Sequence, residues 1–215
     1  MKQSLMFFCL IFLISCVSGG TVSSKYNPVV NSVTVGNTVI HINNDLKYIP
    51  SDKGAYNAGN IDDEYGSDIE RTYHIFVEKN KKINSGVCVL VQRLTDPHHY
   101  LRTSLNYDHV KNFLKKGKIK IDNKVCYYFI AERKYIPKDI FKRIRIHGLK
   151  FVNKGCMHVV YLRKQLGSSR WVDVIYAEGG ENCTFYHGEA PNGYKEDVID
   201  DVWNNFNKAA KISHQ

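Results

Sequence analysis

The stretch Trp171-Val172-Asp173-Val174-Ile175-Tyr176-Ala177-Glu178 gives the plainest indication of the architecture, because it predicts a strand with two apolar faces. Val172, Val174 and Tyr176 would share one face, and Trp171, Ile175 and Ala177 the other, since side chains alternate along a strand. Both faces of the sheet that contains this strand are therefore expected to be largely buried.

Similar short apolar runs, bounded by Gly, Asn, Asp and Lys, recur along the chain and predict further strands. The expected strands are 32–35, 38–42, 72–78, 86–93, 125–133, 157–164 and 171–178, with weaker ones near 118–121 and 183–187. Several neighbouring runs could form hairpins. The sequence therefore predicts a mainly antiparallel sheet.

Helices are expected to be fewer. Asn106 or Asp108 could cap a short helix that stops at Gly117, and Pro137 could open another that ends before Gly148. The clearest helical pattern is near the C-terminus, over residues 196–211. Its apolar stripe is formed by Val198, Ile199, Val202, Trp203, Phe206 and Ala209 or Ala210. An amphipathic helix that packs on a sheet gives the fold class α+β.

The first residues have the layout of an export signal. Lys2 precedes an unbroken apolar run over residues 5–14, which is too short to cross a bilayer core that needs about 20 residues. The run closes on Leu13-Ile14-Ser15-Cys16, which resembles the lipobox of bacterial lipoproteins. The resemblance implies a signal peptide over 1–15, and a membrane anchor in which lipid, such as palmitate, is attached at Cys16.

The residues that follow Cys16 bear on where such a lipoprotein would reside. Val17, rather than an aspartate, follows the cysteine, and in the family this favours the outer membrane, with the domain facing the periplasm. Residues 16–31 are rich in Gly, Ser, Asn and Thr and are expected to be a flexible tether. The alternative is ordinary cleavage after Gly19, which would release a soluble secreted protein.

Beyond the tether, residues 32–215 have the length of a single globular domain. Within it, residues 43–66 are the least patterned part and are expected to be a long surface loop, a first place to look for a binding surface. Its acidic residues do not follow the calcium-binding EF-hand pattern.

The chain carries a formal net charge of +9, and loss of residues 1–15 removes only the charge of Lys2. Basic residues cluster over 111–120 and over 138–145, where they alternate with apolar residues. Such a balance is compatible with anionic lipid headgroups, cell-wall polymers or nucleic acid and does not choose among them. The expected partners are the membrane, through the lipid anchor, and an envelope protein or an anionic polymer. Nucleic acid is not expected as the partner of an exported, tethered domain.

Four cysteines lie in the predicted domain: Cys88, Cys126, Cys156 and Cys183. An even number in an exported protein favours two disulfides, with three pairings open. A zinc site is the alternative, but no close Cys-x-x-Cys or Cys-x-x-His pair supports it. No metal or other cofactor is expected.

Catalytic motifs with known spacing, such as Gly-x-Ser-x-Gly and His-Glu-x-x-His, do not occur in the sequence. Asp96, His98 and His99 form the one local cluster with acid–base potential, but an Asp-Pro turn with surface histidines is the favoured interpretation. The leading expectation is a binding or structural component of the envelope. A tethered periplasmic hydrolase that uses this cluster is the alternative.

The mature domain is also similar to uncharacterised exported bacterial proteins. The similarity rests on Val33-Thr34-Val35, on Asn37 with Ile40 and Ile42, on Tyr48-Ile49-Pro50, on residues 170–176 and on Trp203. It implies export and transfers no activity.

Overall fold

The computed structural model describes residues 23–50, 56–58, 69–80, 82–94, 113–133, 138–151, 156–180 and 196–214, and strands account for most of these described residues. The fold is mainly antiparallel, with a helix near the C-terminus, as predicted. Among the described residues, no helix combines the length and the apolar character that a membrane crossing requires.

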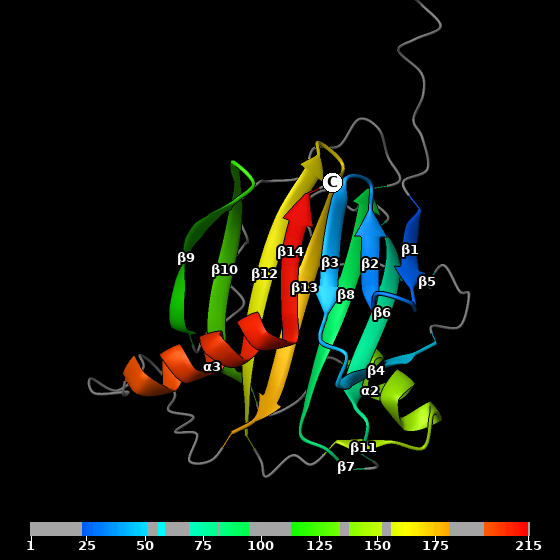
Figure 1. Cartoon of the computed structure of the whole chain (residues 1–215), viewed down its shortest axis with the longest axis vertical. Helices are drawn as coiled ribbons and strands as arrows, with labels where there is room; N and C mark the ends of the chain where they lie inside the picture. Colours follow the sequence, from blue (N-terminus) through cyan, green and yellow to red (C-terminus); the bar gives the residue numbers. More distant parts are fainter. Residues whose placement is uncertain are drawn as a thin grey trace, which may run out of the picture.

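The large sheet has the strand order β4-β6-β8-β13-β12-β10-β9, and β5 also pairs with β6 (Figure 1). All of these pairs are antiparallel. The strands are β4 (Leu46–Ile49), β5 (Tyr56–Ala58), β6 (Ile69–Glu78), β8 (Ser85–Leu94), β9 (Phe113–Ile121), β10 (Lys124–Arg133), β12 (Met157–Gly167) and β13 (Arg170–Gly179). The apolar stretch that predicts a doubly buried strand forms β13, between β8 and β12.

A small sheet lies in front of the large one in Figure 1 and has the order β1-β2-β3-β14. Its strands are β1 (Ser24–Asn27), β2 (Ser32–Val35), β3 (Thr38–Ile42) and β14 (Ala210–His214). The helix α3 (Glu196–Ala209) leads directly into β14. Two further short strands, β7 (Lys82–Ile83) and β11 (Lys150–Phe151), pair in parallel.

Both faces of the large sheet are buried at β13, as the alternation in that strand predicts. The inner face packs against the small sheet and α3 in one core, where Phe76 and Val174 meet Ile40 and Phe206. The outer face carries a second core beneath the helix α2 (Lys138–Ile146). There Ile140 and Ile144 leave a small apolar cavity over Cys88, Met157 and Ile175.

The expected strands within the described residues are all present, and 32–35 and 38–42 match β2 and β3 residue for residue. The helix predicted after Pro137 is α2, which ends before Gly148, a residue with a φ of 68°. Such a left-handed conformation after a helix end suits glycine. The strand expected at 183–187 lies outside the described residues.

Four expectations are wrong. Phe113 and Leu114, assigned to a helix stopping at Gly117, begin the strand β9. The expected loop 43–66 contains β4 and β5. Part of the expected tether is the strand β1, which pairs with β2. The C-terminal helix ends at Ala209, and Ala210 begins a strand paired with β3. In each case strand pairing or packing with distant residues overrides the local pattern.

Candidate functional site

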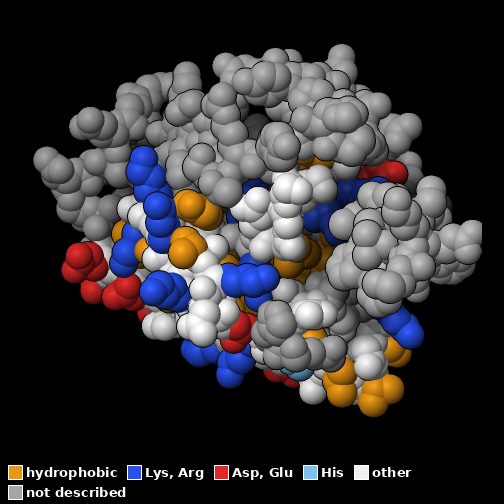
Figure 2. Space-filling model, turned by 90° about the horizontal axis from the view of Figure 1, so that it is seen from above, with side chains coloured by type: hydrophobic (Ala, Val, Ile, Leu, Met, Phe, Trp, Pro, Cys, Tyr) orange, Lys and Arg blue, Asp and Glu red, His pale blue; other side chains and the backbone are white. Residues whose placement is uncertain are grey.

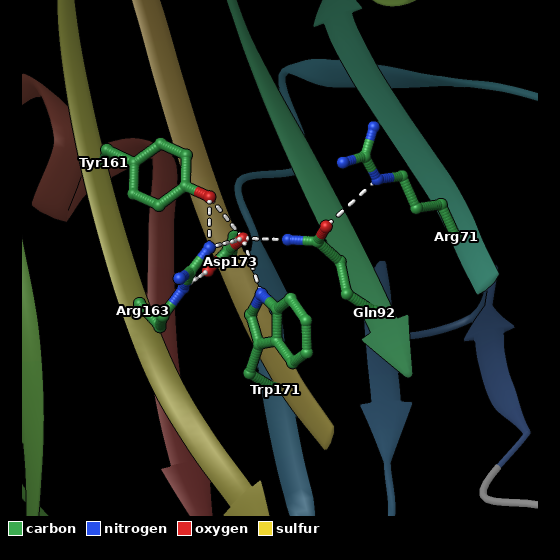
Figure 3. Close-up of polar contacts among 6 residues, drawn as sticks. All are labelled: Arg71, Gln92, Tyr161, Arg163, Trp171 and Asp173. Carbon is green, nitrogen blue, oxygen red and sulfur yellow. Dashed lines mark hydrogen bonds and ion pairs between the residues drawn. The ribbon is translucent and has the colours of Figure 1, made fainter. Parts of the chain in front are cut away.

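A cluster of polar side chains lies on the outer face of the large sheet and is centred on Asp173 of β13 (Figure 3). The Asp173 carboxylate is fully buried and accepts hydrogen bonds from Gln92 Nε2 at 2.5 Å and from Trp171 Nε1 at 3.2 Å. The hydroxyl of Tyr161 donates to the same carboxylate. A buried carboxylate requires such partners, because an uncompensated charge in the interior is costly. With Arg163 and Arg71, these residues are called the Asp173 cluster.

Arg163 of β12 is the charge partner of Asp173. Its Nε donates to Oδ1 at 2.7 Å and its Nη2 to Oδ2 at 2.9 Å, so the pair is bidentate. Its guanidinium carbon also lies 5.1 Å from the centre of the Trp171 ring and 5.6 Å from that of Tyr161. Burial alone would lower the pKa of Arg163, but Asp173 outweighs burial and raises it. The guanidinium is therefore charged and fixed in orientation.

Tyr161 links the two charged groups. Its hydroxyl donates to Asp173 and accepts a hydrogen bond from Arg163 Nη2 at 3.0 Å. Burial, followed by the charge of Asp173, raises the pKa of Tyr161 well above its usual value. The phenol therefore stays protonated and acts as a hydrogen-bond donor at neutral pH.

A second guanidinium joins the cluster through Gln92 of β8. The Gln92 amide nitrogen donates to Asp173, so its oxygen faces away from Asp173 and accepts from Arg71 Nε at 3.0 Å. Figure 3 shows the terminal nitrogens of Arg71 pointing away from Gln92. Arg71 is half-buried and positively charged. Its terminal N–H groups, which do not bond to Gln92, are therefore suited to binding an anion.

The register of the sheet explains how residues far apart in sequence meet here. Trp171 lies opposite Gln92, and Gln92 opposite Arg71. Arg163 lies opposite Asp173 in the adjacent row. The cluster spans four neighbouring strands, and its side chains share the outer face because they occupy matched positions in the pleat.

The chemistry of this cluster favours recognition over proton transfer. The lone pairs of Asp173 are occupied by donors from four residues, so its carboxylate is suited to holding guanidinium groups in place rather than to accepting a proton. Oriented arginines on a rigid sheet match the geometry of carboxylate and phosphate groups.

The outer-face rows continue from the cluster to the edge strand β9. Tyr127 of β10 lies opposite Arg163 on one side and Lys118 on the other. Lys118 Nζ lies 5.3 Å from the centre of the Tyr127 ring. Lys116, Lys118 and Lys120, here called the lysine edge, are exposed and alternate along β9, so they project on one side.

A row of three titratable side chains lies at the other end of the large sheet, on its inner face. Glu132, His158 and Glu178 are neighbours across β10, β12 and β13, and Glu178 accepts from Tyr176 at 2.6 Å and from Asn205 of α3 at 3.1 Å. Burial lowers the pKa of His158 and raises that of Glu178. Glu132 and His158 are only 4% and 6% exposed, which leaves little room for a substrate.

The structure differs from the expected disulfide framework. Cys88 and Cys126 carry buried thiols, so the expected disulfides are not present at these positions. Cys88 faces the outer core and Cys126 the inner core, and β12 and β13 separate their strands. That separation exceeds the span of a disulfide, about 7 Å between Cα atoms at most. Cys156 is disulfide-bonded, and Cys183 lies outside the described residues.

The other predicted site residues also lie outside the described residues: Cys16, Asp96, His98 and His99. Among the described residues, no group of three His, Cys, Asp or Glu side chains is arranged to hold a metal ion. His158 is a buried residue of β12.

The sequence interpretation missed the Asp173 cluster. The available signal was a charged residue in a continuous apolar run: Asp173 stands between Val172 and Val174, and a buried charge needs a partner. Its partners could not be identified without the register. The sequence matches no protein-family model and no curated protein.

Proposed function

We propose that this chain is a bacterial envelope lipoprotein, anchored in the outer membrane through lipid on Cys16, whose periplasmic domain has a binding role. The opening sequence supports the anchor, because a short apolar run ends at Leu13-Ile14-Ser15-Cys16. The disulfide of Cys156 is consistent with an oxidising compartment.

The binding role rests chiefly on one observation, the arginine pair of the Asp173 cluster. Asp173 fixes Arg163 directly and orients Arg71 through Gln92. Such a preorganised set of donors suits an envelope component with carboxylate or phosphate groups, either an anionic polymer or another protein. The proposal includes one α+β domain, which contains β1 because this strand pairs with β2, and an amphipathic C-terminal helix.

Intact mass of the protein exported from a bacterial host tests the anchor, with Cys16→Ala as the variant and Cys9→Ala as the matched control. The expected wild-type mass is that of a chain that starts at Cys16 and carries acyl groups. Cys9→Ala should keep those groups, because Cys9 lies inside the apolar run that is removed. A wild-type chain that starts at Gly20 without lipid would refute the anchor and indicate a secreted protein.

The same samples test the covalent framework when they are measured with and without reduction. Since Cys88 and Cys126 are buried thiols, one disulfide, formed by Cys156 with Cys183, is the pairing that remains within the domain. Reduction should then add the mass of two hydrogens. A gain of four hydrogens would contradict this pairing.

A further inference from the structure

The cavity beneath α2 lies on the same face of the large sheet as the Asp173 cluster. Ile140 and Ile144 of α2 form one wall, and Ile, Val, Ala and Met side chains of the strands form the other. With its open mouth included, the space is about 410 Å³, which falls within the range of roughly 300–1,000 Å³ for ligand pockets. A cavity with apolar walls suits a hydrocarbon rather than a polar ligand.

Two strands lead from the Asp173 cluster to this cavity, and both have the same order of side chains on the outer face. Residues that share a face of a strand are two positions apart, which is about 6.6 Å. On each strand an arginine comes first, a tyrosine second, and an aliphatic residue of the cavity wall third. These residues are Arg163, Tyr161 and Val159 on β12, and Arg71, Tyr73 and Ile75 on β6. The backbone of each arginine is therefore about 13 Å from that of the cavity wall.

The two tyrosines join the arginines to the cavity through apolar contacts. Tyr73 belongs to the outer core, and Tyr161 packs against it and lies opposite Ile175 of the cavity wall. Figure 2 looks onto the end of the molecule at which β12 turns into β13 in Figure 1, and Lys and Arg side chains lie among hydrophobic ones there. The outer face thus changes from basic to apolar along the direction of its strands.

Arg71 supplies positive charge at the basic end. Its Nε is held by Gln92, and its terminal nitrogens point away from that residue (Figure 3). Arg71 forms no ion pair with another described residue. Guanidinium donors that are held in a fixed direction match a carboxylate or a phosphate.

We propose that the arginines and the cavity bind one ligand, an amphiphile with a single alkyl chain and an anionic head, either a carboxylate or a phosphate. The head contacts Arg71 and Arg163, and the chain passes the tyrosines and enters the cavity beneath α2. The inference rests on the proposed binding role of the arginine pair and names the class of ligand. An anionic polymer would use the arginines and leave the cavity empty, whereas an amphiphile matches both parts of the face.

Calorimetric titration of the unlipidated mature chain, residues 16–215 with Cys16→Ser, tests the proposal. The ligands are linear fatty acids from hexanoate to dodecanoate, all below the concentrations at which they form micelles. Affinity should rise by about fourfold for each added CH2 until the cavity is full, because each buried methylene leaves water. Dodecyl phosphate is compared with dodecanoate, and the tighter of the two identifies the preferred head group.

Substitutions at the two ends of the face separate the head from the chain. Arg71→Gln should weaken dodecanoate binding at least about tenfold, because hydrogen bonds to a charged group are lost, and should leave dodecanol binding unchanged. The matched control is Arg93→Gln, since Arg93 is half-buried next to Gln92 but points to the inner face, and it should change dodecanoate affinity less than about threefold. Ala177→Leu should end the rise in affinity at a shorter chain, because Ala177 lines the cavity. Equal urea midpoints would show that the variants fold alike.

Three results would overturn the proposal. If hexanoate and dodecanoate bind equally or not at all, no alkyl chain enters the cavity; polyglutamate that still binds and is lost in Arg71→Gln would then leave the proposed anion-binding role standing. If dodecanol binds as tightly as dodecanoate and Arg71→Gln has no effect, the arginines do not bind the head, and the proposed role fails with the inference. If Arg71→Gln and Arg93→Gln weaken binding equally, net charge is responsible. Because the tested chain has no lipid, failure of the Cys16 anchor is measured separately by mass.

Discussion

Asp173 is the residue on which the polar contacts of the outer face depend. Its replacement by Asn removes the negative charge opposite Arg163. The Asn NH2 group would also face the N–H donors that now bond to the carboxylate. We expect a loss of about 3–5 kcal/mol in the free energy of unfolding, the usual cost of breaking a buried ion pair. Urea unfolding followed by tryptophan fluorescence measures it, since Trp171 touches the carboxylate. The exposed Asp45→Asn is the control, and a loss below about 1 kcal/mol would contradict this role.

Lys164, unlike Asp173, is a buried charged residue whose charged atom makes no hydrogen bond among the described residues. Its side chain is fully buried, its Nζ has no hydrogen-bond partner among the described residues, and its nearest counter-charge is Asp122 at 3.8 Å. Replacement by Met keeps most of the volume and removes the desolvated charge, so we expect unfolding to cost about 1–2 kcal/mol more than in the wild type. Lys164→Ala should instead destabilise the fold by about 2 kcal/mol because it leaves a cavity. Destabilisation by both variants in urea unfolding would show that the ammonium group itself is needed.

His74 makes stability depend on pH. Its Nε2 lies 2.8 Å from the hydroxyl oxygen of Ser24 and its Nδ1 3.4 Å from that of Tyr48, and burial lowers its pKa to about 4. Between pH 6.5 and about 4 the unfolded chain binds a proton that the folded chain does not, so stability should fall as pH falls through this window. The slope from one such group is at most about 1.4 kcal/mol per pH unit.

The variant His74→Gln separates this effect from those of other titrating groups. His158 acts in the same direction, whereas the raised pKa of Glu178 acts in the opposite one. The difference in urea midpoint between pH 6.5 and 4.5 should therefore shrink in His74→Gln and stay unchanged in the exposed His41→Gln. An equal pH response in His74→Gln and the wild type would exclude His74 as the source.

At the scale of elements, β14 closes the small sheet. Ala210 and Ile212 pair with Ile42 and Ile40 of β3, and the preceding Ala209 oxygen accepts from the Asn43 backbone at 2.9 Å. A chain that stops after Ala209 should lose about 2–3 kcal/mol of stability, because it forfeits the packing of Ile212 and exposes the backbone of β3. Thermal unfolding measures this loss, and Lys211→Ala, which keeps the strand, is the control. An unchanged midpoint in the truncated chain would show that β14 is dispensable.

Strands with strong alternation could be predicted from the sequence, while elements that depend on distant partners could not. β2 and β3 alternate clearly and have a glycine in the turn between them, Gly36, with a φ of 58°. Gly117 seemed to end a helix, but it lies within β9, where the ring of Tyr128 passes 2.9 Å from the position of a β-carbon. Only the fold shows that the ring of Tyr128 is the reason for glycine at this position.

The same limit applies to the candidate site. Arg163 and Asp173 both fall in predicted strands, yet their pairing depends on the register between β12 and β13. The lysine-rich run was noted as basic, but its place on an edge strand requires the order of all the strands. Local patterns identify the residues that carry charge, whereas long-range pairing decides which of them meet.

On the scale of the whole molecule, the large sheet contributes one face to each of two hydrophobic cores and also carries several buried polar side chains. The inner core joins it to the small sheet, and the outer core joins it to α2. Asp173 and Lys164 lie on central strands of the large sheet. A substitution at either position should therefore change the stability of the whole domain, which is expected to unfold in one cooperative transition. The exposed lysines of β9, by contrast, can change without disturbing either core.

The small sheet also has a consequence for biogenesis. Its outer strands, β1 and β14, come from opposite ends of the described chain, and β14 completes it only after every other element has been made. A chain that is threaded through a secretion channel from its amino terminus could not finish this sheet on the cytoplasmic side while its first residues are already in transit. Under the proposed export, this topology would delay completion of the small sheet until translocation has finished.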